Sequence, residues 1–229
     1  MNNDVFIIRC YNRYSELDIL LYQLGELNIK NIKLIFNGGD NYESYYESYY
    51  LSKNRGYQLG ELDLLNKSFE LANNKDTIYH FLLTGCYIYN KDRFLDYINN
   101  IERYSYNLFI PNGATYNFLT KESCNITNLY FVGGVFSIKG KQISKLDDFD
   151  VFAQKTMVSE LTNGNKIEVT AGDCIENYLF RELNKQFTKN EIRTLKSSRP
   201  SDHFYQTDCG IVRPNRFSNN YKQIMETIM

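Results

Sequence analysis

Two kinds of apolar pattern divide this chain, and the first kind marks buried strands. Apolar runs of strand length occupy Val5–Cys10, Ile32–Phe36 and Ile78–Leu83, and each ends abruptly in a polar or glycine-containing turn. Runs that are apolar on both faces are typical of strands inside a parallel sheet. We predict further strands from shorter or alternating patterns at 108–110, 128–138, 166–170 and 192–195.

The second pattern is helical, because apolar side chains recur at steps of three and four residues. It is clearest in Leu62–Ala72, after the turn Asn54–Gly56, and in Asp173–Phe187. Less regular versions predict further helices at 15–24, 42–50, 94–101 and 146–161. In the tyrosine-rich segment 42–50 the aromatic stripe is expected to be a packing face, with sugar stacking as the alternative for one or two tyrosines.

Strand, helix and strand follow one another within the first 36 residues, which implies a parallel pair joined by a right-handed crossover. The sequence therefore predicts an α/β fold with a mostly parallel, twisted, Rossmann-like sheet flanked by helices. No low-complexity linker interrupts the chain, so we expect one domain over residues 1–229. We expect two halves within this domain, about residues 1–112 and about residues 113–229.

Charge and cysteine content exclude several classes. The formal net charge of −1 gives no reason to expect nucleic acid as a partner. No apolar run reaches the roughly 20 residues that cross a bilayer, and the first residues lack a basic signal-peptide region. Five widely spaced cysteines without a CxxC pair indicate neither a zinc site nor a disulfide framework, so we expect a cytoplasmic protein. Seven basic against three acidic residues in 189–222 would allow contact with the inner face of a membrane.

Polar side chains gather where the predicted parallel strands end. Ends of parallel strands open on one edge of the sheet, where ligands of such folds bind. Arginine suits a phosphate, an amide suits a base edge, and an acid suits a ribose. The alternative is ordinary turn chemistry, since Asn, Gly and Asp are turn formers. The candidate nucleotide contacts are Arg9, Tyr11, Asn12, Arg13, Asn37, Asp40, Asn54, Gly56, Thr84, Gly85 and Cys86.

Later residues supply candidates for the chemistry. Asp173 and Glu176 have the spacing of a helix capping box, and a carboxylate there could equally act as a general base toward an acceptor hydroxyl. Gly133 and Gly134 interrupt a predicted strand, which suggests a bulge or a close approach by another group. His203 is either a surface residue or a contact to phosphate or metal.

These segments resemble motifs of the GT-A glycosyltransferases, in particular glycosyltransferase family two. Tyr11-Asn12-Arg13 looks like the end of that family's opening strand, and Asn37-Gly38-Gly39-Asp40 looks like its "D-N-G-S-x-D" turn. Asn54-Arg55-Gly56 is similar to its "N-x-G" segment. Each motif is short, but together with the later ones they span most of the chain.

The later motifs resemble the same family. Gly133-Gly134 matches its acceptor loop in position, and Gly172-Asp173 is similar to its "E-D" pair, whose Asp is the base in inverting members. His203 stands where many members carry a late His that reaches the metal. The resemblance thus implies Asp173 as catalytic base, Gly133 and Gly134 on the acceptor side, and His203 at the phosphate or metal.

The chain departs from this family at Thr84-Gly85-Cys86, where members carry an Asp-x-Asp that binds a divalent cation. Thr and Cys do not supply the anionic oxygens that Mg²⁺ or Mn²⁺ prefers. The departure predicts either a metal-independent enzyme, in which Arg or Lys replaces the cation, or a binding protein without activity. A metal held by other groups is the remaining alternative.

The resemblance implies a hexosyltransferase-type enzyme. It would move a sugar from a nucleotide-sugar donor to a hydroxyl of a bacterial capsule, lipopolysaccharide or glycoprotein glycan. We expect the donor to be a UDP-sugar. The acceptor would be a glycan or a lipid-linked glycan. The resemblance also implies that about residues 1–112 form the nucleotide-binding half and about residues 113–229 the acceptor half. The alternatives are a retaining transferase of the same fold and a non-catalytic nucleotide- or sugar-binding protein.

Overall fold

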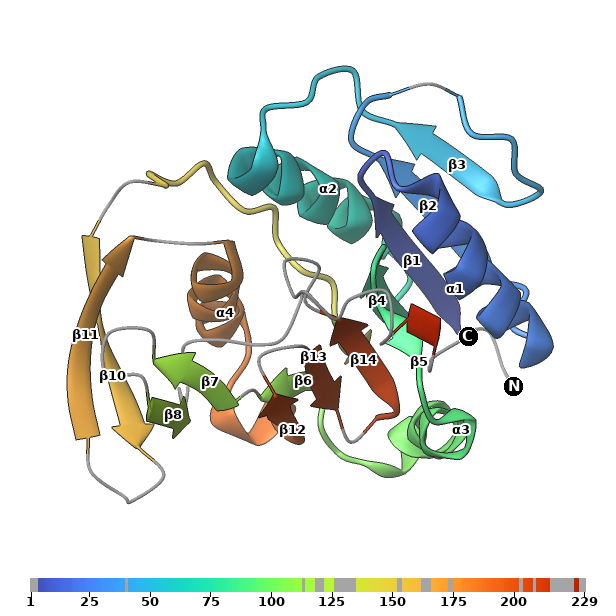
Figure 1. The fold of residues 1–229 in the computed structure, drawn as a ribbon. Coiled ribbons are helices and arrows are strands. Elements are labelled where there is room, and N and C mark those ends of the chain that lie inside the picture. The colour runs from blue at the N-terminus through green and yellow to red at the C-terminus, as the bar shows by residue number, and fades with distance from the viewer. Residues whose placement is uncertain are drawn as a thin grey trace.

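A central mixed sheet organises the molecule around its first strand, β1 (Val5–Cys10) (Figure 1). β2 (Ile32–Phe36) and β4 (Ile78–Leu83) flank β1 in parallel, and β3 (Glu47–Tyr50) pairs in parallel with β2. Beyond β4 come β9 (Phe136–Lys139), β6 (Leu108–Asn112) and β12 (Ile192–Ser201). Within these seven strands β9 runs against the others, so the predicted α/β fold with a mostly parallel sheet is confirmed.

The computed structural model describes residues 4–39, 41–112, 114–117, 122–125, 135–151, 154–161, 166–172, 175–201, 204–207, 209–214 and 225–226. Three antiparallel strands extend the central sheet beyond β12: β13 (Phe204–Thr207), β14 (Ile211–Pro214) and β5 (Tyr87–Ile88). A second sheet has the order β11-β10-β8-β7 and consists of β7 (Ala114–Asn117), β8 (Glu122–Asn125), β10 (Gln154–Leu161) and β11 (Lys166–Gly172).

Helices cover both faces of the central sheet. α2 (Tyr57–Leu71) and α4 (Ile175–Gln186) pack in one core cluster with Ile7 of β1. α1 (Tyr14–Glu26) and α3 (Lys91–Asn100) pack in the other with Ile8. Two short 3₁₀ turns, η1 (Ile101–Arg103) and η3 (Lys189–Glu191), complete the regular structure that is described. No helix in these ranges is long and apolar enough to cross a membrane.

The tyrosine-rich segment is not the predicted helix. Residues 41–46 have no regular structure, and Glu47–Tyr50 forms the edge strand β3. Tyrosine favours strands over helices, and here strand pairing with β2 stacks Tyr50 on Phe36 with ring centroids 4.8 Å apart. Tyrosines are so dense in this segment that their spacing fits both the helical period and the strand period. Pairing with β2 therefore decides that residues 47–50 form a strand.

The helix predicted for 146–161 is also wrong. Residues 141–150 run without regular structure along α2, where Leu146 enters the core and exchanges two hydrogen bonds with the side chain of Asn66. Gln154–Leu161 then forms strand β10 and pairs antiparallel with β11. Leu146 is buried and is held through its backbone, so the segment is fixed against α2 without forming a helix.

Candidate functional site

The sheet has a topological switch point between β1 and β4. From β1 the chain proceeds outward to β2 and β3, and then returns to β4 on the opposite side of β1. In open α/β sheets, ligands bind in the crevice beyond the carboxyl ends of the strands at such a point. The predicted segments after β1, β2 and β4 therefore share this edge of the sheet.

The turn after β4 is tied to the end of β1. The Thr84 N–H donates to the Arg9 carbonyl at 2.9 Å, and the Tyr11 N–H donates to Thr84 Oγ1 at 3.4 Å. Thr84 and Cys86 are each about 1% exposed, and burial raises the pKa of the Cys86 thiol. Both side chains are therefore buried, and neither the Thr84 oxygen nor the Cys86 sulfur is exposed to solvent.

Arg13 lies directly over this turn. Gly85 has a φ of +88°, and a Cβ there would lie 2.9 Å from Glu16 Oε2 and 3.4 Å from Arg13 Nη1. Arg13 Nη1 lies 3.5 Å from Glu16 Oε2, and its side chain is about one quarter exposed. The loop after β1 therefore places a partly exposed guanidinium beside the turn after β4.

Arg9 is placed very differently. It is fully buried, and its Nε donates to Glu61 Oε1 on α2 at 2.8 Å. The Tyr11 hydroxyl donates to the other oxygen of Glu61, Oε2, at 2.8 Å. Arg9 lies on the same strand face as Val5 and Ile7, toward α2. This network attaches the end of β1 to α2. Arg9, which we predicted as a nucleotide contact, is part of this network.

The loop after β2 meets the loops after β1 and before α2. A Cβ on Gly39 would lie 2.4 Å from Asn12 Oδ1, so these two loops are in direct contact. Asn37 is about 1% exposed, and its Nδ2 donates to Asn54 Oδ1 at 3.1 Å. Its Oδ1 has no hydrogen-bond partner in the described part of the chain. Asn37 therefore retains a buried acceptor at the candidate site.

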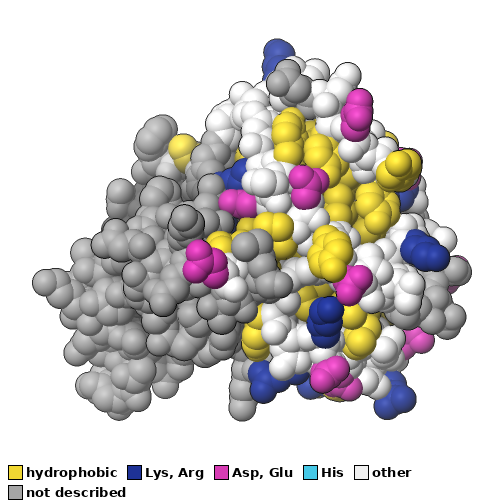
Figure 2. Space-filling view, turned by 45° about the vertical axis from the view of Figure 1, so that its right-hand side comes forward, with side chains coloured by type: hydrophobic (Ala, Val, Ile, Leu, Met, Phe, Trp, Pro, Cys, Tyr) yellow, Lys and Arg dark blue, Asp and Glu magenta, His cyan; other side chains and the backbone are white. Residues whose placement is uncertain are grey.

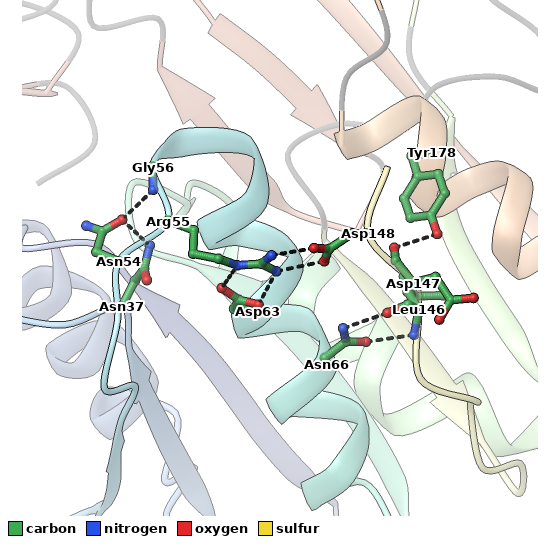
Figure 3. Close-up of polar contacts among 10 residues, drawn as sticks. All are labelled: Asn37, Asn54, Arg55, Gly56, Asp63, Asn66, Leu146, Asp147, Asp148 and Tyr178. Atoms are coloured by element: carbon green, nitrogen blue, oxygen red, sulfur yellow. Dashed lines mark hydrogen bonds and ion pairs between the residues drawn. The ribbon is translucent and has the colours of Figure 1, made fainter. Parts of the chain in front are cut away.

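Asn54 also organises the start of α2 (Figure 3). Its Oδ1 accepts from the Gly56 N–H at 2.9 Å, and Gly56 precedes the helix with a φ of +87° and no side-chain cap. Arg55 points the other way. Its guanidinium donates to both oxygens of Asp63 and both oxygens of Asp148, at 2.6–2.9 Å. These bonds raise the pKa of Arg55 and fix it away from Asn54.

The start of α4 lies beside the start of α2. The Ile175 N–H donates to Gln58 Oε1 at 2.7 Å, which satisfies one of the free donors of the first turn of α4. The structure describes α4 from Ile175 onward, and its predicted start at Asp173 lies outside the described residues. Glu176 follows Ile175 in α4, next to the segments already described.

Five candidate residues lie outside the described residues: Asp40, Gly133, Gly134, Asp173 and His203. The remaining candidates converge on one edge of the sheet, although Arg9, Asn37, Thr84 and Cys86 are buried. A feature that sequence reasoning missed is the aromatic cluster next to Asn37. Phe36 has Tyr14, Tyr42 and Tyr50 around it, with ring centroids 4.8–6.1 Å away.

This aromatic cluster extends onto the surface. The Tyr50 hydroxyl accepts from the Tyr42 N–H at 2.8 Å and donates to its carbonyl at 3.0 Å, so the segment is held against β3. Figure 2 shows hydrophobic side chains, a class that includes tyrosine, gathered on the face that it draws. Tyr22 and Tyr45 are strongly exposed. Helical spacing in the sequence concealed this cluster, because its members come from α1, β2, β3 and the irregular segment 41–46.

The residues present do not fit a divalent cation at the turn after β4. Glu16 brings one carboxylate there, but Arg13 lies against it, and Thr84 already bonds to backbone atoms. Across the described ranges no group of three His, Cys, Asp or Glu side chains could hold a metal ion. Hard cations need several oxygen ligands, which these side chains do not provide.

No family model and no curated protein matches this chain. Among solved structures it is similar to A197 from STIV, with 11% sequence identity, a TM-score of 0.39, and coverage of 94% of this chain and 95% of that one.

Proposed function

We propose that this protein is a glycosyltransferase that moves a sugar from a nucleotide-sugar donor, a UDP-sugar, to a hydroxyl of a bacterial surface glycan. The observation that carries the proposal is the convergence of four polar segments at the switch point of the sheet: Arg9–Arg13, Asn37–Gly39, Asn54–Gly56 and Thr84–Cys86. The resemblance to GT-A glycosyltransferases concerns the same segments.

Each of three contacts suits one part of the donor. The unpartnered Oδ1 of Asn37 would accept from an N–H of the base, and the aromatic cluster around Phe36 offers rings for stacking. Arg13 would contact the diphosphate, next to the start of α1. α1 and α2 both begin at this edge without a side-chain cap, and helix N-termini favour anions.

In this proposal Arg13 performs the electrostatic work that a cation does in related enzymes. As the glycosidic bond to the diphosphate breaks, negative charge grows on the leaving oxygen, and a nearby guanidinium stabilises it. Asp173, close in sequence to Ile175, would take the proton of the acceptor hydroxyl as its oxygen attacks the anomeric carbon opposite the leaving diphosphate, and this direct displacement gives inversion. Asp173→Asn should then keep donor binding and lose turnover, whereas Glu176→Gln should keep most activity.

The experiment that tests the donor site is a thermal-shift titration with UDP, GDP, CDP and their sugars, with EDTA and then with Mn²⁺. A ligand of the native state at 100 times its Kd stabilises it by about 2.7 kcal/mol, so the melting temperature should rise. We expect UDP compounds to act, in EDTA as well. No shift by any nucleotide at millimolar concentration would refute the donor site, and a shift that requires Mn²⁺ would refute the role of Arg13.

The second candidate is a nucleotide- or sugar-binding protein without activity. It is favoured by the buried Thr84 and Cys86, which leave the turn after β4 without a pair of carboxylates. The same titration separates the two when donor hydrolysis and transfer are measured together. Binding of UDP-sugar without any turnover on a panel of glycan acceptors would favour the binding protein.

A further inference from the structure

A groove on the outer side of α2 has features that the nucleotide site does not use. Its volume is about 590 Å³, within the usual range for small-molecule sites. One wall is the loop that follows β3, including Ser52 and Lys53, and another is α2. The irregular segment 142–145 lies opposite, held to α2 by the bonds between Asn66 and Leu146 shown in Figure 3.

The side chains along this groove carry a positive excess. Four are cationic (Lys53, Arg55, Lys67 and Lys145) and two are acidic (Asp63 and Glu70), so the lining has a net charge of +2.

Two of the four cations already have partners. Arg55 bonds to Asp63 and Asp148, and Lys67 lies 2.8 Å from Glu70. Lys53 and Lys145 form no ion pair or hydrogen bond with the residues that the structure describes, although Lys145 helps to lower the pKa of Asp148. Two ammonium groups on different walls of the groove therefore have no ion-pair partner among the described residues.

The rest of the lining indicates what kind of ligand would carry the anionic group. Ser52 and Gln142 are exposed, and their side chains make no hydrogen bond to the described residues. They can bond to hydroxyl groups. The apolar part of the lining is small, because Ile143 and Phe69 are only 5% and 2% exposed. Hydroxyl-bonding groups, two free cations and a small apolar area together match a sugar that bears a negative charge.

We propose that this groove binds an anionic sugar, in which a carboxylate or a phosphate is attached to a polyhydroxylated ring. Lys53 and Lys145 bind the charged group, and Ser52 and Gln142 bind the hydroxyls. The inference stands apart from the proposed transfer reaction, because it rests on residues outside the switch point. It adds a second site, next to Arg55, that binds an anionic sugar.

The test is an NMR titration of the full chain, observed through the amide signals of Ser52, Lys53, Gln142 and Lys145. The probes are glucuronate, glucose 6-phosphate, glucose and inorganic phosphate. We expect both anionic sugars to shift these signals, glucose not to, and phosphate to bind at least about tenfold more weakly because it gains no hydroxyl contacts. The two anionic sugars show whether a carboxylate or a phosphate is preferred.

The matched variants are K53A/K145A and, as control, K30A, which removes an exposed lysine that does not line the groove. K53A/K145A should weaken glucuronate binding roughly tenfold to a hundredfold, since hydrogen bonds to charged groups are the stronger ones. K30A should bind like the wild type.

Equal binding by the wild type and K53A/K145A would overturn the site, and so would equal binding of glucose and glucuronate. Phosphate as strong as the anionic sugars would overturn the sugar part. UDP binding is measured in the same samples, so failure of this groove and failure of the donor site are distinguishable.

Discussion

Two arginine–glutamate pairs lie near each other at the carboxyl edge of the sheet, and they differ in burial and in geometry. Arg9 is fully buried and lies 2.8 Å from Glu61. Arg13, four residues later, is about one quarter exposed and lies 3.5 Å from Glu16. The first pair attaches β1 to α2, and the second lies over the turn after β4.

The difference comes from where the strand ends. β1 ends at Cys10, so Arg9 is still a strand residue whose side chain points to the same face as Ile7, into the core. Arg13 lies beyond the strand, immediately before α1, where side chains at the sheet edge reach solvent. Whether an arginine at this edge packs in the core or can reach a ligand therefore depends on whether it lies within the strand or beyond its end.

The largest effect is expected from Arg9→Ala. Removing one partner of a buried ion pair leaves Glu61 with an uncompensated charge, which costs about 3–5 kcal/mol. Arg13→Ala should change the free energy of unfolding by less than about 1 kcal/mol, because partly exposed pairs contribute little. Urea denaturation of both variants measures this contrast.

A control for the buried pair replaces both partners by apolar residues. Arg9→Met with Glu61→Leu should recover much of the stability, since no charge is left buried. If Arg9→Ala were as stable as the wild type and lost only nucleotide binding, Arg9 would be a ligand contact and the comparison would fail.

The second effect concerns Arg13 and rests on the proposed donor site. Arg13→Gln should weaken UDP binding roughly tenfold to a hundredfold, because a charge-assisted hydrogen bond is worth about 1.5–3 kcal/mol. Glu16→Gln is the matched control: it removes the partner of Arg13 and should leave UDP affinity equal or higher. Calorimetric titration measures both, and unchanged affinity in Arg13→Gln would exclude the diphosphate contact.

A third effect compares two helical glycines. A Cβ on Gly25 in α1 meets nothing within 4 Å, so Gly25→Ala should stabilise the protein by about 0.4–1 kcal/mol. A Cβ on Gly60 in α2 would lie 2.3 Å from Asn37 Nδ2. Overpacking of about 1–3 kcal/mol then offsets the helical gain of about 1 kcal/mol, for a net loss of about 0–2 kcal/mol.

Gly60→Ala should also displace Asn37 from Asn54 and weaken UDP binding, whereas Gly25→Ala should not. Thermal denaturation and UDP titration of the two variants give the comparison. Equal stabilisation by both alanines would mean that Asn37 is free to move and is not held as an acceptor.

The sequence predicted the first part of the fold well because the strands there are buried on both faces. β1, β2 and β4 have the predicted bounds, since their apolar runs stop sharply at polar turns. The prediction failed where tertiary pairing decides, as in β3, whose tyrosines fit two periods, and in 141–150, which is fixed by Asn66. The short strands β5, β13 and β14 have too few residues to show a period.

For the candidate site, the sequence predicted which segments meet but not which side chains face outward. Parallel strands place their carboxyl ends together, so the grouping of Asn12, Asn37 and Asn54 follows from strand order. Whether a side chain at such an end is buried depends on its long-range partner. Glu61 takes Arg9 inward, and backbone bonds hold Thr84. Neither partner can be identified from local spacing.

The smallest effect concerns a third arginine, Arg55, which is at the surface and bonds to Asp63 and Asp148. Its hydrogen bonds lower the pKa of Asp148 below the ordinary 3.8. Because the folded pKa is the lower one, the pair stabilises the protein above the unfolded pKa, and this contribution is lost as the pH falls through the folded value. Asp148→Asn should thus lower the melting temperature slightly at pH 6 and make no difference at the most acidic pH.

Asp147→Asn is the control, since Asp147 contacts Tyr178 through its backbone carbonyl. Melting curves from pH 2 to 7 measure the difference. Identical curves for Asp148→Asn and wild type would show that this exposed pair contributes nothing, and that burial alone separates Arg9 from the other two arginines.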